Sequence, residues 1–269
     1  MDLIDQTKDL AKVAIIGGTG VYDPSMFRDA KEVRVYTPYG PTSPFLSIGY
    51  HDDEKIAFIP RHGKDHSIPP HKINYRANIY ALKQIGVERI ISISSVGSLQ
   101  ENLQPGKFVF PDQFIDRTKS RGDTFFDGGK VVHVSSADPF CPQMRAIFGN
   151  CAQKLQISSR ENGTYVCIEG PRFSSRSESK LFRNWGADII GMTLYPECIL
   201  AREAQMCYSS ISMVTDYDVW AEKPVSAVEV SETLRKNIDT VKRLVLSVID
   251  SLPERRSCDC GNSLSGAIL

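Results

Sequence analysis

Short runs of β-branched and apolar residues alternate with longer segments of helical period through most of the chain. Apolar side chains recur at steps of three and four within INYRANIYALKQIG, residues 73–86, and again from Val230 to Leu252. That spacing places them on one face of a helix. Strands are expected at KVAIIG, EVRVYT, KIAFIP, ERIISIS, GTYVCIEG, ADIIGM and SISMVTD. Strands that alternate with helices predict the α/β fold class.

The 269-residue chain shows no internal repeat, no low-complexity tract and no linker before the tail that follows Leu252. Single α/β domains often reach roughly 200 to 250 residues, so length alone does not require two. We therefore expect one domain over residues 1–269, with a tail at about 253–269. Ser175 with Glu178, and Ser226 with Glu229, have the spacing of a capping box. Each pair therefore predicts the start of a helix.

Charge and hydropathy exclude several classes of protein. The 32 basic and 32 acidic residues give a formal net charge of zero, which argues against a nucleic-acid partner. No apolar run approaches the roughly 18 residues of a membrane span. The first twelve residues carry acids where a secretory signal carries bases. We expect a cytoplasmic protein with neither a membrane nor a nucleic acid as partner.

The segment VAIIGGTGVYD, residues 13–23, predicts a strand followed by a glycine-rich loop. A dinucleotide-binding turn needs glycine at its sixth position, where Asp23 stands when counting starts at Gly18. A nucleotidase phosphate loop needs a Gly-Lys-Ser/Thr ending, which is missing. The remaining alternatives are a loop that holds free phosphate and an ordinary tight turn.

Polar residues follow four of the expected strands. Ligands of open α/β sheets bind outside the carboxyl ends of the strands, and hydroxyls, a guanidinium, an imidazole and freed backbone amides suit a phosphate anion. The residues are Thr19 after the first strand, Arg61 and His62, Ser94 and Ser95 with Gly97, and Met192 with Thr193. Each alone is common in turns and caps, but their coincidence at four strand ends predicts a phosphate site.

Two carboxylates, Asp216 and Asp218, follow the expected strand SISMVTD. Residues spaced i, i+2 project to the same side while the chain stays extended. A carboxyl shielded from water has a raised pKa and can deliver a proton to a leaving nitrogen. The alternative is a pair of solvated turn aspartates. Phe173, in a Gly-Pro loop before a helix, favours the first interpretation because its ring can stack on a base.

With these motifs the sequence resembles the trimeric nucleoside phosphorylases, and among them the 5'-methylthioadenosine phosphorylases. The resemblance covers most of residues 13–220 and includes IIGGTGVYD, PRHGKDHSIPPHKINYRANIYAL, IEGPRFSSRSES and WGADIIGMT. It implies a single domain with a mixed, twisted central sheet. It also implies phosphate-dependent cleavage of 5'-methylthioadenosine to adenine and 5-methylthioribose 1-phosphate, in purine and methionine salvage.

The resemblance also implies a role for individual residues. Inorganic phosphate, the second substrate, would be held by Gly18, Thr19, Gly20, Arg61, His62, Ser94, Ser95 and Thr193. The nucleoside would be held by Met192 along the ribose, by Phe173, Ser174 and Tyr217 at the purine, and by Asp216 and Asp218 at N7 and the 6-amino group. Ala227 and Val230 would line the 5'-thiomethyl pocket, and Asp216 and His62 would be catalytic. His133 would reach a neighbouring subunit's site, so a homotrimer or a hexamer of two trimers is implied.

No metal or organic cofactor is expected, since the five histidines show no ligand spacing typical of zinc. Substrate range stays open, because one thiomethyl group in an apolar pocket is worth only about 1 to 3 kcal/mol. Adenosine and other purine nucleosides are further candidates. The alternative functions are a nucleosidase that uses water in place of phosphate, a nucleoside-binding protein without activity, and a dinucleotide-dependent oxidoreductase.

Seven cysteines are present, and buried free thiols are the default for a cytoplasmic enzyme. The tail RRSCDCGNS contains a Cys-x-Cys that resembles one in heat-adapted archaeal members of the family, where intracellular disulfides occur. That resemblance implies a disulfide between Cys141 and Cys207.

Overall fold

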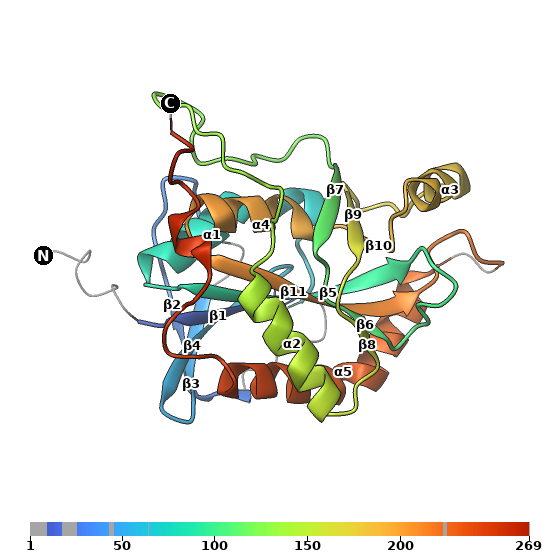
Figure 1. Ribbon diagram of the computed structural model, residues 1–269, viewed down its shortest axis with the longest axis horizontal. Coiled ribbons are helices and arrows are strands. Elements are labelled where there is room, and N and C mark those ends of the chain that lie inside the picture. The colour runs from blue at the N-terminus through green and yellow to red at the C-terminus, as the bar shows by residue number, and fades with distance from the viewer. Residues whose placement is uncertain (1–9, 18–25, 43–45, 64, 223–224, 269) are drawn as a thin grey trace, which may run out of the picture.

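Eleven strands form one mixed sheet in the computed structural model, which describes residues 10–17, 26–42, 46–63, 65–222 and 225–268 (Figure 1). The expected α/β class is confirmed. The glycine-rich loop with Gly18, Thr19, Gly20 and Asp23 lies outside the described residues.

The longest path through the sheet runs β2-β3-β4-β1-β5-β10-β9-β7, and β11, β6 and β8 branch from β5. The strands are β1 Val13–Gly17, β2 Arg28–Val33, β3 Leu46–His51, β4 Glu54–Pro60, β5 Arg89–Ser98, β6 Phe108–Val109, β7 Gln113–Arg117, β8 Ser159–Arg160, β9 Thr164–Ile168, β10 Ile189–Gly191 and β11 Cys207–Asp216. Strand β5 pairs in parallel with β1 and β11 and antiparallel with β10. Because β1, β4, β5 and β11 run parallel, their carboxyl ends meet at one edge.

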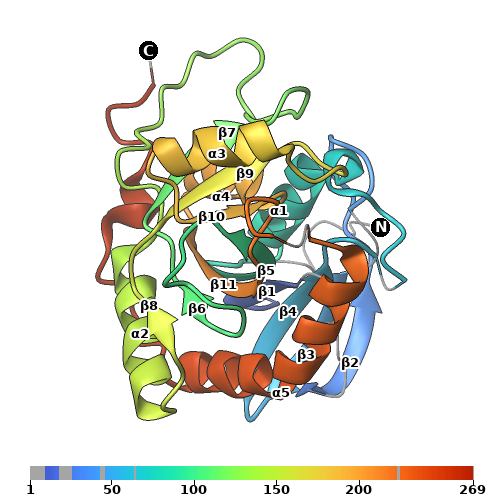
Figure 2. The ribbon, with the colours of Figure 1, turned by 90° about the vertical axis from the view of Figure 1, so that its right-hand side faces the viewer.

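Helices cover both faces of this sheet. Helices α1 Tyr75–Gln84 and α4 Leu194–Glu203 pack together on one face, and α2 Pro142–Lys154 and α5 Ala227–Asp250 on the other (Figures 1 and 2). Helix α3 Arg176–Asn184 lies beyond β9, and two short 3₁₀ helices span Pro70–Lys72 and Asp259–Asn262. Two large apolar clusters correspond to the two faces. None of the helices described is long and apolar enough for a bilayer.

Central strands match the sequence prediction better than edge strands. Six expected strands coincide with β1, β4, β5, β9, β10 and β11. The segment EVRVYT, residues 32–37, overlaps only the end of β2, and β3 was not predicted. Strand β2 has the sequence RDAKEV and is exposed over most of its length, so it carries no apolar alternation.

The helix starts are confirmed, with one correction. Ser175 and Glu178 form both hydrogen bonds of a capping box at α3. At α5, the Ser226 side chain accepts from the Glu229 N–H at 3.2 Å. The return bond from the Glu229 carboxylate, which a full capping box requires, is not formed among the described residues.

The C-terminal tail packs against the body of the domain. The Arg89 guanidinium donates to the Pro253 carbonyl at 2.7 Å, the Gln205 amide to the Gly261 carbonyl at 2.6 Å, and the Ser263 hydroxyl to the Arg202 carbonyl at 2.6 Å. All seven cysteines are free thiols, so the disulfide implied between Cys141 and Cys207 is not present in the structure.

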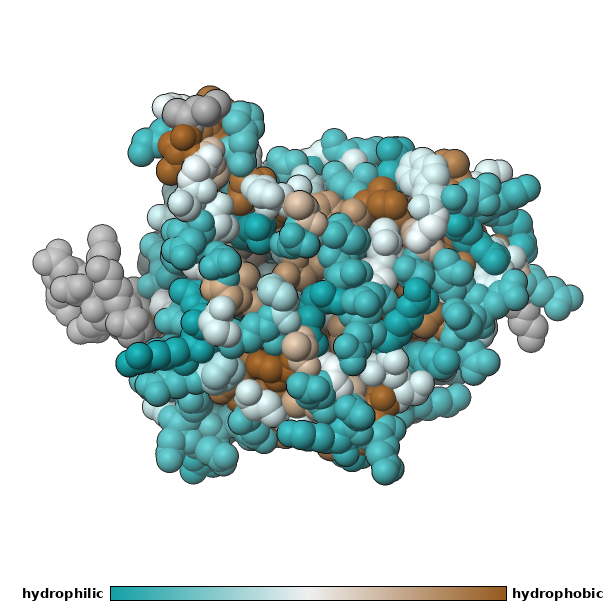
Figure 3. All heavy atoms as spheres, in the orientation of Figure 1, coloured by the Kyte–Doolittle hydropathy of each residue, from teal (hydrophilic) through white to brown (hydrophobic). Residues whose placement is uncertain are grey.

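The end of the tail forms a projection with the segment between β7 and α2. Val132 bridges to Ile268, and the His133 N–H donates to the Ala267 carbonyl at 2.8 Å. We call residues 128–134 and 264–268 the C-terminal projection. Val131 and Ile268 expose large apolar side chains there. The face shown in Figure 3 is otherwise mostly polar, with apolar side chains in small separate patches.

Candidate active site

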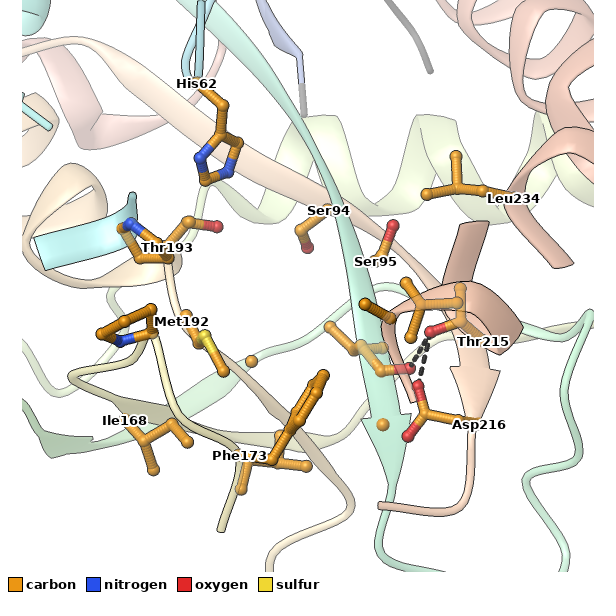
Figure 4. A pocket seen from close by; sticks show the side chains of 18 of the residues that line it. His62, Ser94, Ser95, Ile168, Phe173, Met192, Thr193, Thr215, Asp216 and Leu234 are labelled. Carbon is orange, nitrogen blue, oxygen red and sulfur yellow. Dashed lines mark hydrogen bonds between the residues drawn. The ribbon is translucent and has the colours of Figure 1, made fainter. Parts of the chain in front are cut away.

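A cavity of about 510 Å³ opens at the sheet edge where β4, β5, β10 and β11 end (Figure 4). Of the residues predicted for the site, it is lined by Arg61, His62, Ser94, Ser95, Phe173, Met192, Thr193, Asp216, Asp218, Ala227 and Val230. Ser174, Tyr217 and His133 are not among its lining residues. Six separate segments of sequence therefore meet in one cavity.

Arg61, directly after β4, is buried and held by a network. Its side chain and that of Glu197 are each 1% exposed, and Nε and Nη2 donate to the two carboxylate oxygens at 2.7 Å. Ser92 and the Ile93 carbonyl accept further N–H bonds at 2.8 and 3.2 Å. Burial alone would lower the pKa of Arg61, but the Glu197 carboxylate raises it. The guanidinium stays charged, with most of its five N–H donors used by the protein.

His62 is neutral at physiological pH. Burial, together with the Arg61 charge, lowers its pKa to about 4. Nδ1 lies 2.9 Å from the Ile68 carbonyl, and since a carbonyl only accepts, the proton is assigned to Nδ1. Nε2 then carries no proton and accepts hydrogen bonds. The His66 ring lies 4.4 Å away, centroid to centroid.

Three hydroxyl side chains, those of Ser94, Ser95 and Thr193, line the cavity. Ser94 and Ser95 come from β5, and the Ser94 hydroxyl also lies 3.3 Å from that of Ser212. Thr193 occupies the N-cap of α4 without making a side-chain capping bond. Figure 4 shows its hydroxyl pointing into the cavity.

Asp216 and Asp218 lie at the opposite end and are 5% and 3% exposed. Asp216 accepts from the Thr215 hydroxyl at 2.7 Å and from the Asp218 N–H at 2.8 Å. Burial nevertheless raises the pKa of both carboxyls. The expected extended conformation is wrong, because β11 ends at Asp216 and Asp218 has a φ of 51°. The turn still brings both residues to the cavity wall.

Gly97 makes room for this pair. A Cβ there would lie 2.9 Å from Asp216 Oδ1 and 3.3 Å from Asp218 Cβ, closer than ordinary van der Waals contact. One Asp218 oxygen, Oδ2, is buried and has no hydrogen-bond partner among the described residues. A buried acceptor without a donor is costly, so a ligand donor at this point would relieve the cost.

Phe173 lies at the rim and is 38% exposed, and its ring faces the cavity (Figure 4). The neighbouring Ser174 is buried, but its hydroxyl has no partner among the described residues and is not part of the wall. The Tyr217 ring meets the Trp220 ring edge to face, with the centroids 5.4 Å apart. His133 is exposed on the C-terminal projection.

Helix α5 forms an apolar wall beside the carboxylates. Ala227, Val230 and Leu234 line the cavity with Ser231 between them, and they share one helix face because they are three and four residues apart.

Comparison with known proteins gives the family. The family model of the phosphorylase superfamily matches residues 12–250. The chain belongs to the phosphorylase superfamily. It is 59% identical over 258 residues to the S-methyl-5'-thioadenosine phosphorylase of Thermofilum pendens. This alignment covers 96% of this chain and 98% of that protein.

Solved structures of this superfamily have the same fold. A methylthioadenosine phosphorylase from an antarctic soil metagenomic library superposes with a TM-score of 0.91 at 42% identity, covering 97% of this chain and 93% of that one. A variant of the Schistosoma mansoni adenosine/methylthioadenosine phosphorylase, solved with methylthioadenosine, superposes with a TM-score of 0.86 at 39% identity. The match covers 89% of this chain and 91% of that one.

Sequence reasoning missed several residues of the cavity of this phosphorylase-superfamily chain. Glu197, which holds Arg61 from behind and does not itself line the cavity, gave no signal, because it stands 136 residues from Arg61. Thr215 precedes Asp216 at the end of the expected strand SISMVTD, where its hydroxyl gave no separate signal. Leu234 was detectable, since it follows Val230 at a helical step of four.

Proposed function

We propose that the protein catalyses the phosphate-dependent cleavage of 5'-methylthioadenosine to adenine and 5-methylthioribose 1-phosphate. The observation that carries this proposal is one cavity with anion-binding groups at one end and two buried carboxylates at the other. Relatives named S-methyl-5'-thioadenosine phosphorylase, which are more than half identical to this chain over nearly its whole length, support the same substrate.

The phosphate end would bind and orient the nucleophile. Arg61 supplies a fixed positive charge, and Ser94, Ser95 and Thr193 supply hydroxyl donors; we assign Thr19 in the glycine-rich loop to the same anion. Neutral His62 accepts a hydrogen bond through Nε2, so it suits the P–OH group of hydrogen phosphate. That contact would turn an unprotonated phosphate oxygen toward C1'.

The base end would meet the charge of the leaving group. As the C1'–N9 bond breaks, its electron pair moves into the purine, and the sugar becomes oxocarbenium-like while a phosphate oxygen bonds to C1'. Asp216, with its pKa raised by burial, donates its proton to N7. Asp218 Oδ2 accepts from the 6-amino group, and Phe173 stacks on the ring. Ser174 and Tyr217 support the loops around the base.

The sugar would lie between these two ends. Met192 would pack along the ribose, and Ala227 and Val230 on α5 would receive the uncharged thiomethyl group. Inorganic phosphate is a co-substrate in this mechanism, and no step requires a cofactor. Adenosine, which carries a 5'-hydroxyl in place of the thiomethyl group, is a second candidate substrate, as are other purine nucleosides.

We also propose that the enzyme acts in the cytoplasm as a homotrimer or as a hexamer of two trimers. His133 lies outside the cavity of its own chain, on a projection with exposed apolar side chains. That placement supports a contact in which the projection reaches a neighbouring subunit.

A phosphate-dependence assay tests the proposed reaction. Adenine release from 5'-methylthioadenosine is followed with phosphate and in phosphate-free buffer, and the sugar product is identified by mass. We expect release only with phosphate, and a sugar 1-phosphate product. Equal release without phosphate would show a nucleosidase, and binding without turnover in either buffer would show a nucleoside-binding protein.

A further inference from the structure

Four cysteine sulfurs converge on one point on the other side of the domain from the cavity. Cys141, Cys207, Cys258 and Cys260 bring their sulfur atoms within 4.8 Å of one another, and three of the four residues are buried. Cys141 is the N-cap residue of α2, Cys207 begins β11, and the other two belong to the tail at the second 3₁₀ helix. Three elements that are distant in sequence thus supply one cluster.

The sulfur separations match a metal site better than disulfides. Cys258 Sγ lies 3.6 Å from Cys141 Sγ and 3.3 Å from Cys207 Sγ. A disulfide requires about 2.05 Å. Four sulfurs bound to one zinc at about 2.3 Å define a tetrahedron with edges of about 3.8 Å. Disulfides would also need only pairs of sulfurs, whereas here all four are mutually close.

We propose that Cys141, Cys207, Cys258 and Cys260 form a structural site for a thiophilic divalent cation, Zn²⁺. Each thiol gives its proton to solvent and each thiolate donates one electron pair to the metal, without any change of oxidation state. Four thiolates around Zn²⁺ leave a net charge of −2. The Arg256 guanidinium donates to the Gln205 carbonyl at 3.0 Å, close to the Cys207 thiol, and offsets part of that charge.

Four protein ligands leave no open position on a tetrahedral ion, which is the arrangement of structural rather than catalytic zinc. Cys207 and Asp216 are the first and last residues of β11, so the site lies about 30 Å along the strand from the proton donor. The metal would attach the tail to α2 and to the start of β11, and so stabilise the fold without touching substrate.

Zinc content and thiol state test this site in the full-length protein. The chain is expressed with added zinc, passed through gel filtration, and analysed by inductively coupled plasma mass spectrometry. We expect one zinc per chain, with all seven cysteines alkylated after unfolding in chelator without reductant. Cobalt added to the chelated, refolded protein should give the visible absorption bands of a tetrahedral tetrathiolate.

Variants locate the ligands. Cys258→Ser and Cys260→Ser should each lose the zinc and lower the melting temperature, while KM for the nucleoside stays unchanged. Cys151→Ser is the matched control, because that buried thiol bonds to Ser247 and Ser251 instead of the cluster, and it should keep the metal. Substoichiometric zinc together with no cobalt bands overturns the proposal. The proposal is also overturned if the mass of the unreduced chain is lower than expected by two hydrogens for each pair of cysteines, because that loss shows disulfide bonds.

Discussion

At the scale of single residues, the proposed mechanism gives the carboxylates of Asp216 and Asp218 separable tasks. Asp218→Asn can rotate its amide to donate a hydrogen bond, so it should disfavour a 6-amino purine and favour a 6-oxo purine. We expect the ratio of kcat/KM for 5'-methylthioadenosine to that for 5'-methylthioinosine to change by about tenfold or more, since about 1.4 kcal/mol is a factor of ten. Asp216→Asn is the control, because losing the proton donor should depress both substrates. An unchanged ratio in Asp218→Asn would place base selection elsewhere.

If Asp216 is the proton donor, as proposed, the sign of the reaction's pH dependence follows. Burial raises the pKa of Asp216, while the Thr215 hydroxyl and the Asp218 N–H lower it. The acid form is the donor, so kcat/KM should fall as pH rises through this pKa. Thr215→Val removes the bond that favours the ionised form and should move the fall to higher pH by roughly one pH unit. A fall that moves to lower pH would rule out Asp216 as the acid.

At the scale of elements, the buried ion pair joins the end of β4 to helix α4 and to β5 and β11. Arg61, Ser92 and Tyr208 all hydrogen-bond to the Glu197 carboxylate. Glu197→Gln leaves the guanidinium charge without its counter-charge, at a cost of about 3 to 5 kcal/mol in stability. It should also raise KM for phosphate while KM for the nucleoside changes little.

Glu203→Gln is the matched control for Glu197→Gln. Glu203 is also a largely buried carboxylate of α4, but it accepts from the Thr124 hydroxyl and the Phe125 N–H, whereas Glu197 accepts from Arg61. Thermal melting and phosphate saturation curves of both variants separate the two roles. If both variants changed phosphate KM equally, Glu197 would act only through general stability.

The start of α5 should set the preference for a thioether at the 5' position. Val230→Asn places an amide in the apolar wall, so KM for 5'-methylthioadenosine should rise more than KM for adenosine. We expect the ratio of the two KM values to increase by roughly tenfold. Val228→Asn on the same helix is the control, because Val228 is 67% exposed and does not line the cavity. An equal effect on both nucleosides would move the thiomethyl pocket away from Val230.

The elements also show which parts of the fold a single sequence predicts. Strands β1 and β4 appear as near-continuous apolar runs, and β5 and β11 were recognised from isoleucine, valine and methionine placed among small serines. Strand β2 is stabilised by pairing with β3 at the sheet edge, and its polar residues give no such run. Strand ends also predicted most of the cavity, because parallel strands bring their carboxyl ends to one edge. Glu197 was missed because its partners are set by tertiary contacts alone.

At the scale of the whole molecule, the C-terminal projection carries His133 away from the cavity of its own chain. Exposed Val131 and Ile268 on the same projection favour a contact with another copy, and a head-to-tail contact of this kind closes as a ring when it is repeated by rotation. We expect light scattering to give a mass of three or six chains. A fully active monomer would contradict this assembly.

Mixed oligomers test whether His133 completes a neighbour's site. His133→Ala and Asp216→Asn homo-oligomers should each have low activity, because every site lacks one of the two groups. In oligomers assembled from equal amounts of the two chains, a complete site forms where a His133→Ala chain keeps its own Asp216 and its neighbour supplies His133. Random assembly around a ring makes about a quarter of all sites complete, so activity should rise toward that fraction of the unmodified enzyme. Activity that stays at the mean of the two parents would confine His133 to a role within its own chain.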